Sequence, residues 1–228
     1  MLRSIAEGVW VAEGVLKAPM GMKMTIRSTI LKLDANNLMV ISPIEPTPKL
    51  VQDINDIGMV RYIVAPNGMH HLYVNKFAAN FTDAEIWGPA DLHAKRNDIQ
   101  FTGVLDPDEI MPWDRYVETH GIKARAPMFE EFIFFHSKTR TLIVTDLMFN
   151  FHRFDNWLMT LIAKLNGGYN RLAMTRLGKM YFNNMDSLRS AIRQILDWKP
   201  ENLIVAHGDV IQGGATPELE VATARILT

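Results

Sequence analysis

The chain has 228 residues, of which 48% are hydrophobic and 21% charged, with a formal net charge of -1 and no cysteine. Such a composition is typical of a soluble globular protein with one large domain or two small ones. It excludes disulfides, thiolate metal ligands and cysteine catalysis, and the balanced charge gives no reason to expect nucleic acid or an anionic membrane as a partner.

The N-terminal residues Met1 to Gly8 lack the uninterrupted apolar region of a signal peptide. No apolar run in the chain reaches the roughly 18 residues needed to span a bilayer. We therefore expect a cytoplasmic protein.

The first forty or so residues predict an antiparallel meander. Apolar and polar residues alternate between 22 and 33, a polar turn occupies 34–37, and residues 38–42 have the composition of another strand. Several prolines between 43 and 48 then end the sheet.

Beyond this point the pattern predicts strands that alternate with helices. The predicted strands are 60–65, 84–87, 131–135, 141–145 and 203–206, with breaks at Gly88-Pro89 and a hairpin turn at 137–140. The predicted helices are 50–57, 71–79, one from Asp91, 154–165, 186–198 and 217–227. Two mixed sheets packed together with helices outside accommodate this order, so the class is α/β with mixed α+β character.

Three of the apolar runs end abruptly in His or Asp. Val64-Ala65-Pro66-Asn67-Gly68-Met69 leads to His70 and His71, a second run ends at Asp146, and a third ends at His207. Together these side chains form one set of ligands for a single transition metal. The structural alternative for each residue is a helix cap, a turn or a buried hydrogen bond.

These residues resemble the metallo-β-lactamase superfamily, in a divergent bacterial branch of unknown function, over most of the chain. The superfamily fingerprint is His-x-His-x-Asp-His, followed by a middle His, a bridging Asp and a last His. Aligned on it, His71 takes the final His and His70 replaces the Asp, while Asp146 and His207 match the bridging Asp and the last His. Pro66 and Gly68 stand at the first two histidines, and Ala126-Pro127-Met128 stands where the middle His is expected.

The resemblance implies a four-layer αββα sandwich over a single domain, 1–228. Of the two metal sites of the superfamily, the first would retain His71 and Asp146, and the second would retain His70, Asp146 and His207. We therefore expect one divalent metal or none. Zn is the first choice, with Fe, Ni or Mn as alternatives, because imidazole and carboxylate ligands discriminate weakly among these ions.

The expected function is a hydrolase-like protein in which one metal ion activates water against an unknown ester, thioester, amide or phosphoester. The competing expectation is a catalytically inactive member of the fold that serves as a binding or interaction module. A third expectation for the function is redox chemistry at a bound iron ion.

Further residues near these strand ends are candidates for supporting roles. Asp209, two residues after His207, could orient a ligand histidine or shuttle a proton as a catalytic group, or lie in a solvated turn. Asn67 could bind a substrate carbonyl, or hold its loop through an Asx turn. Glu130 and Glu131 lie near the missing histidine. One of them could replace it as a ligand, but we expect surface carboxylates at these positions.

The segment 148–182 differs most from the superfamily pattern and is predicted to be a helical lid or interface insertion. It interleaves aromatic residues with basic ones and follows Asp146 directly. One hypothesis is selection of an amphipathic, anionic substrate, and the alternative is a helical pair that covers the sheet. A further alternative is that the segment makes a homodimer contact.

Overall fold

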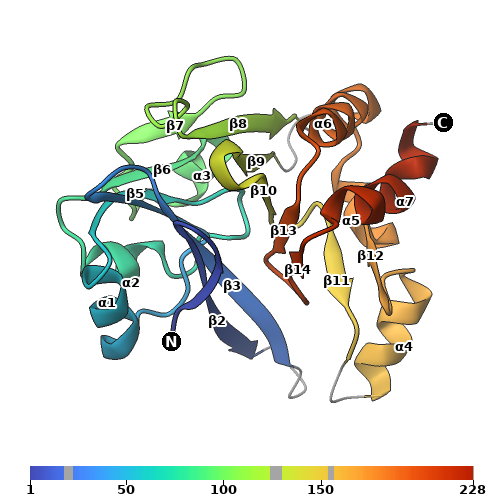
Figure 1. Cartoon of the computed structure of the whole chain (residues 1–228), viewed down its shortest axis with the longest axis horizontal. Coiled ribbons are helices and arrows are strands. Elements are labelled where there is room, and N and C mark those ends of the chain that lie inside the picture. Colours follow the sequence, from blue (N-terminus) through green and yellow to red (C-terminus); the bar gives the residue numbers. More distant parts are fainter. Residues whose placement is uncertain (18–22, 124–129, 154–156, 228) are drawn as a thin grey trace.

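The computed structural model of the chain describes residues 1–17, 23–123, 130–153 and 157–227. Its strands form two large sheets and one short ribbon, and Figure 1 shows helices on the two outer sides of the sheets. Within these ranges, no helix combines the length and the apolar character that crossing a bilayer requires.

The first sheet contains seven strands that lie in sequence order. They are β1 (Arg3–Ala6), β2 (Val9–Lys17), β3 (Lys23–Lys32), β4 (Asn37–Ile41), β5 (Met59–Val64), β6 (Glu85–Pro89) and β7 (Gly103–Leu105). Strands β1 to β4 pair antiparallel, which confirms the predicted meander, and β4 to β7 pair parallel. The parallel strands are joined through α1 (Pro48–Asn55), α2 (Val74–Ala78) and α3 (Ala90–Lys95), as parallel pairing requires.

The second sheet contains five strands in the order β14-β13-β10-β9-β8. Their bounds are β8 (Val117–Ile122), β9 (Glu131–His136), β10 (Thr141–Val144), β13 (Asn202–Val205) and β14 (Ile211–Gln212). A 3-10 turn, Ser137–Thr139, links β9 to β10, and helices α6 (Met185–Trp198) and α7 (Ala215–Leu227) belong to this half. Strands β10 and β13 pair parallel, so their carboxyl ends meet at one edge.

Alternation along the strands explains why three apolar layers form. In β4, Met39 and Ile41 belong to the core between the sheets, whereas Leu38 and Val40 belong to the core beneath the outer helices α1 to α3. Successive side chains of a strand point to opposite faces, so a strand buried on both faces is a continuous apolar run. Strand β9 is likewise a continuous apolar run because both of its faces are buried.

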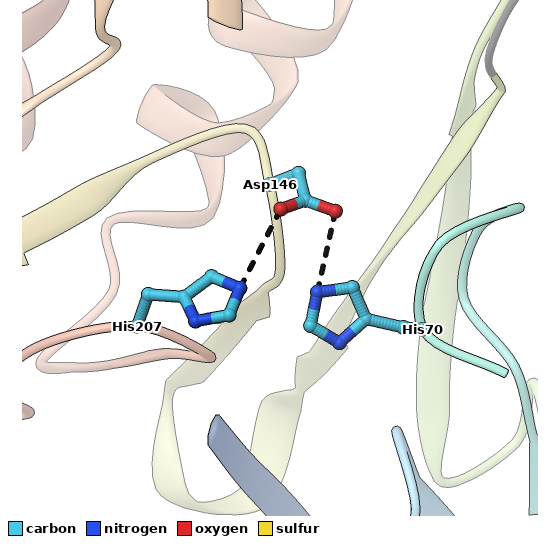
Figure 2. A group of neighbouring side chains, drawn as sticks. All are labelled: His70, Asp146 and His207. Carbon is cyan, nitrogen blue, oxygen red and sulfur yellow. Dashed lines mark ion pairs between the residues drawn. The ribbon is translucent and has the colours of Figure 1, made fainter. Parts of the chain in front are cut away.

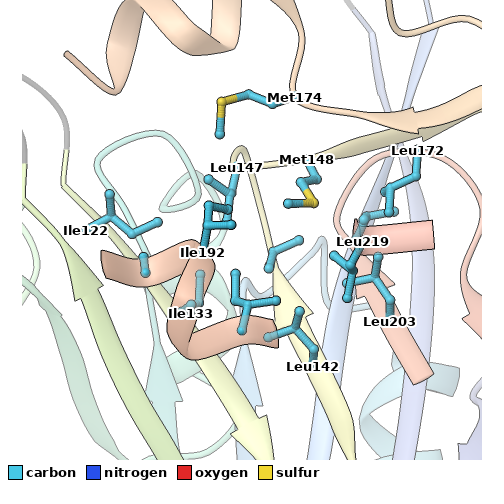
Figure 3. Packing of buried hydrophobic residues seen from close by; sticks show 14 of the residues in the cluster. Ile122, Ile133, Leu142, Leu147, Met148, Leu172, Met174, Ile192, Leu203 and Leu219 are labelled. Atoms are coloured by element: carbon cyan, nitrogen blue, oxygen red, sulfur yellow. The ribbon is translucent and has the colours of Figure 1, made fainter. Parts of the chain in front are cut away.

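The third apolar layer lies between the second sheet and the helices α6 and α7. Figure 3 shows Ile133 and Leu142 from the sheet beside Ile192 of α6, with Leu219 of α7 close to Leu203. The layers therefore run helices, sheet, sheet, helices, and the predicted αββα sandwich is confirmed.

The segment after β10 is more varied than the predicted helical lid. It contains a two-stranded antiparallel ribbon of β11 (Phe149–Phe151) and β12 (Arg171–Ala173), together with α4 (Trp157–Leu165) and α5 (Arg176–Tyr181). Residues 154–156 of the predicted helix 154–165 lie outside the described residues.

Two predicted boundaries were wrong for local reasons. Gly88 and Pro89 continue β6 instead of breaking it, and Pro89 is tolerated because it is the last residue of the strand. The predicted helix 71–79 is only the five-residue α2, which follows a run of turns after His70.

Candidate metal centre

The candidate centre lies where the carboxyl ends of strands from both sheets meet. Val144 of β10 and Val205 of β13 are paired in register, so Asp146 and His207 each follow their strand by two residues at the same level. The loop after β5 joins from the other sheet through a hydrogen bond from the Phe132 amide to the Pro66 carbonyl, 2.9 Å long. This arrangement places His70 opposite the other two residues.

The side chains of His70, Asp146 and His207 converge on one point. His70 Nε2 lies 3.2 Å from Asp146 Oδ2, and His207 Nε2 lies 3.6 Å from Asp146 Oδ1. Figure 2 shows the carboxylate between the two rings, with one oxygen directed at each. One ligand atom from each residue lies within 4.8 Å of the others. All three side chains are largely buried.

These distances fit a divalent metal ion. Two ligand atoms of a tetrahedral Zn²⁺ lie about 3.3 Å apart when each bond is about 2.0–2.1 Å long. The donor set of two imidazoles and one carboxylate also suits Zn, and an open position would remain for water or substrate. The three residues match the second of the two sites that the resemblance implied.

Each imidazole is oriented through its second ring nitrogen. His70 Nδ1 lies 2.7 Å from the Ser42 hydroxyl, and His207 Nδ1 lies 2.9 Å from the carbonyl oxygen of Thr25. The Thr25 carbonyl can only accept, so His207 Nδ1 carries a proton and donates it. In the neutral ring the lone pair is then on Nε2, where it could bind a metal ion held between this ring and Asp146. Such partners fix the ring orientation of metal-binding histidines.

Asn67 connects the His70 loop to Asp146. Its Oδ1 accepts from the amides of Met69 and His70, both at 2.9 Å, and its Nδ2 donates to Asp146 Oδ2 at 2.8 Å. Asn67 is fully buried. The Asn67 side chain therefore holds the His70 loop next to Asp146, and its role in substrate binding stays a prediction.

Glu131 holds the backbone turn that carries Asp146. The expectation that Glu131 is a surface carboxylate was wrong. Its carboxylate accepts from the backbone amides of Thr145, Asp146 and Leu147 at 2.9, 2.9 and 3.2 Å, and it is fully buried. Burial and the nearby Asp146 carboxylate raise the pKa of Glu131 above its ordinary value, whereas the backbone amides that it accepts from oppose this shift. This acid holds the whole turn that carries Asp146.

The charge of Asp146 is favoured by its two histidine neighbours. Burial opposes ionisation of Asp146, but His70 and His207 together outweigh it and hold the pKa of this carboxyl below its ordinary value. Asp146 is therefore ionised at neutral pH and is an anionic ligand for a cation.

His71 does not enter this group. Its Nδ1 lies 2.6 Å from Nη1 of Arg96, and burial together with Lys95 and Arg96 lowers the pKa of His71 to about 4. Neighbouring side chains leave the backbone in different directions, so only one histidine of the pair faces Asp146.

Asp209 is exposed, and its backbone pairs with Asn150 through the Asp209 amide at 2.8 Å. Among the described residues, no hydrogen bond joins its carboxylate to His207, whose ring is held by Thr25 instead. A catalytic role for Asp209 stays a prediction.

Sequence reasoning missed Arg27, which holds the His207 loop from the other sheet. Arg27 is buried, its Nη2 donates to the Gly208 carbonyl at 2.6 Å, and its Nη1 donates to the Val205 carbonyl. Glu13 balances its charge at 2.9 Å. No local signal singled it out, because β3 also contains Thr25, Ser28 and Thr29.

Two cavities open beside the three residues, and both are bordered by Met24, Met69 and Asp146. One has a volume of about 260 Å³ and lies against Phe149, α4 and α5, whereas the other, of about 190 Å³, reaches His70 and His207. Neither has Lys or Arg among the described residues that line it. The hypothesis that basic residues of 148–182 select an anionic group inside the pocket gains no support.

Comparisons with solved structures define the class to which this fold belongs. The metallo-β-lactamase from Hirschia baltica is 12% identical, with a TM-score of 0.67 and coverage of 100% of this chain and 97% of that chain. The metallo-β-lactamase FIM-1 from Pseudomonas aeruginosa in the mono-zinc form is 12% identical, with a TM-score of 0.62 and coverage of 100% and 94%. Rubredoxin oxygen:oxidoreductase from Desulfovibrio gigas is 13% identical, with a TM-score of 0.68 and coverage of 100% of this chain but 61% of that one.

The chain thus has the metallo-β-lactamase fold. Residues 7–162 match the family model described as "Domain of unknown function (DUF4336)", and the chain belongs to this family. The search of curated proteins finds no match.

Proposed function

We propose that this protein is a hydrolase that uses one divalent metal ion held by His70, Asp146 and His207. The observation that supports this proposal is the pair of Nε2–carboxylate distances, 3.2 and 3.6 Å, with each Nδ1 already held by another group. Zn is the favoured ion, and Fe, Ni and Mn accept the same donors.

A bound ion of this kind lowers the pKa of water and polarises a carbonyl or phosphoryl oxygen, which is the chemistry of metal-dependent hydrolysis. The protein's own residues keep the donors in place. Ser42 and Thr25 orient the imidazoles, Asn67 fixes one carboxylate oxygen, and Glu131 anchors the Asp146 turn through its amides. Apolar walls exclude bulk water from the group to be cleaved.

The cavities suggest an uncharged, apolar group next to the cleaved bond. The walls of the larger cavity are mostly Phe, Met, Ile and Ala side chains, and a cavity lined in this way selects by apolar contact. Esters, thioesters, amides and phosphoesters with an apolar substituent fit this description.

The competing function is a binding module that has lost catalysis. Arg96 engages His71, and Pro66 and Gly68 supply no ligand atoms, so the described residues offer donors for one ion and not two. Two-metal hydrolases use both ions to hold the attacking and leaving oxygens. Metal binding without turnover would support this function.

Metal content of purified protein tests the ligand set. We expect about one equivalent of a divalent ion in the wild-type chain, and a loss of most of it in the single variants His70→Ala, Asp146→Ala and His207→Ala. The matched control is His71→Ala, which should keep the ion because its ring faces Arg96. Unchanged metal content in His70→Ala would refute the assignment.

Activity is tested separately with a panel of ester, thioester, lactam and phosphodiester substrates. Hydrolysis should disappear with a chelator and return when the metal is restored. Bound metal without activity on any substrate supports the binding module. Bound iron that cycles between oxidation states, with no hydrolysis, would indicate redox chemistry.

A further inference from the structure

The surface formed by α4 and α5 is unusual because it combines exposed apolar side chains with unbalanced positive charge. Residues 157–185 contain four basic residues and no Asp or Glu, although the whole chain has a net charge of -1. Figure 1 shows α4 at the edge of the molecule, beyond the β11–β12 ribbon.

Helix α4 presents an apolar stripe to solvent. Trp157, Leu161 and Leu165 are spaced by four residues and are 77%, 44% and 64% exposed. At 100° per residue this spacing places them on one face, while Ala163 on another face is buried. Met180 of α5 adds a further apolar side chain that is 70% exposed. A soluble monomer rarely exposes so many large apolar groups together.

Four cations belong to the same segment and are all exposed. They are Lys164, Arg171, Arg176 and Lys179. None of them forms an ion pair with another described residue: Lys164 lies over the Tyr169 ring at 5.1 Å, and Arg171 donates to the Gly167 carbonyl. Within the described part of the chain, no carboxylate therefore neutralises their charge.

We propose that α4 and α5 dock this protein on an anionic lipid surface. Trp and Leu with flanking Lys and Arg are the composition of helices that lie in the membrane interface. Lysine is depleted from protein interfaces, and its long side chain can reach the headgroups while its methylenes lie along the apolar layer. This differs from the expectation of no membrane partner, which rested on the charge of the whole chain.

The cavity geometry agrees with a lipid-facing orientation. Ile162 and Ala163 of α4 and Gly178 and Tyr181 of α5 all line the 260 Å³ cavity. The same cavity reaches Asp146. An apolar chain that leaves the lipid layer between the two helices would arrive beside the candidate metal centre. Docking itself requires neither metal nor catalysis, so it can be tested without them.

The test is sedimentation of the full chain with vesicles of phosphatidylcholine alone or mixed equally with phosphatidylglycerol. We expect binding to the mixed vesicles, and a decrease of at least tenfold in the partition coefficient when salt is raised from low to about 0.5 M, because Debye screening shortens the reach of the cations. Fluorescence should shift to shorter wavelength as Trp157 enters the lipid.

Two pairs of variants separate the two contributions. Trp157→Ser with Leu161→Ser should reduce binding at least tenfold, and Lys164→Glu with Lys179→Glu should abolish the preference for anionic vesicles. The matched controls are Ile110→Ser and Val221→Ser, which remove side chains 90% and 80% exposed elsewhere on the molecule, and Arg225→Glu on α7. Far-ultraviolet circular dichroism confirms that each variant is folded.

Several results would overturn the proposal. The proposal is wrong if the wild-type protein does not sediment with mixed vesicles. If the patch variants and the controls lose vesicle binding to the same extent, the patch is not the contact. A wild-type dimer in light scattering that Trp157→Ser converts to a monomer would identify the patch as a self-interface instead.

Discussion

At the scale of single residues, the site depends on groups that touch no metal themselves. Ser42 directly follows β4 and has φ +55°, in the left-handed region that few non-glycine residues adopt. This conformation accompanies its contact with His70. Backbone strain of this kind is found where function requires a particular geometry. Ser42 lies 28 residues before its partner, so no local pattern revealed it.

Replacing Ser42 with Gly should weaken metal affinity by about tenfold, the lower end of the effect of losing a partner that orients a metal-binding histidine. Glycine accepts the positive φ, so the variant removes the hydroxyl without adding strain. A chelator competition titration measures the change. Ser28→Ala is the matched control, because Ser28 is buried on the neighbouring strand and its hydroxyl donates to the Ile41 carbonyl, away from His70. Equal effects in both variants would contradict an orienting role.

His71 makes the stability of the fold dependent on pH. The unfolded chain protonates His71 near its ordinary pKa of 6.5, whereas burial, Lys95 and Arg96 hold the folded pKa at about 4. The unfolded state therefore binds the proton first, and stability is lost as pH falls from 6.5 towards 4. Urea unfolding with a chelator present should show that wild type loses about 2 kcal/mol more over this range than His71→Gln. Parallel pH profiles would disprove the low pKa.

At the scale of elements, the loop after β13 determines where His207 lies. Gly208 has φ +98°, and a Cβ atom there would overlap the backbone of Asn150. Asn150 and this loop also exchange backbone hydrogen bonds, from the Asn150 amide to the His207 carbonyl and from the Asp209 amide to the Asn150 carbonyl. The ribbon that follows β10 is thereby joined to the end of β13.

Gly208→Ala should destabilise the protein by about 3 kcal/mol or more, because both the positive φ and the overlap disfavour the methyl group. Gly213→Ala is the matched control: its φ is +77°, but nothing lies within 4 Å of the added atom, so only about 1–2 kcal/mol is expected. Chemical unfolding measures both. Equal losses would show that the close approach of Asn150 has no separate cost.

At the scale of the whole molecule, the candidate centre joins the two sheets. His70 belongs to the loop after β5 in the first sheet, whereas Asp146 and His207 follow β10 and β13 in the second. A metal ion held by all three would bind the folded state and not the separated strands, so it would stabilise the sandwich by mass action.

At a free metal concentration about 100-fold above the dissociation constant, binding contributes about 2.7 kcal/mol. Removing the metal from the wild-type chain should therefore lower the melting temperature by roughly 5–10 °C in differential scanning calorimetry. Asp146→Asn, without the anionic ligand, should show little change with the same chelator. A chelator effect of equal size in both proteins would place the metal elsewhere.

The sequence by itself determined the layers and the strand ends. Apolar runs at 60–65, 141–145 and 203–206 predicted buried strands, and His70, Asp146 and His207 stood out because each follows such a run. Burial of a strand produces a local sequence pattern. Every other residue of a half-buried strand, and every residue of a fully buried one, must be apolar.

Only the tertiary structure decided which histidine of the pair joins Asp146, and what holds the three residues. Arg96 engages His71, Ser42 and the Thr25 carbonyl orient the two rings, and Arg27 supports the His207 loop from the opposite sheet. These partners are 25 to 182 residues apart in the chain. Local periodicity carries no information about such pairs. The contacts of Ser42 and Arg96 with the two histidines form when the first sheet and its helices assemble. The contacts of Thr25 and Arg27 with the His207 loop form only when the two sheets pack face to face.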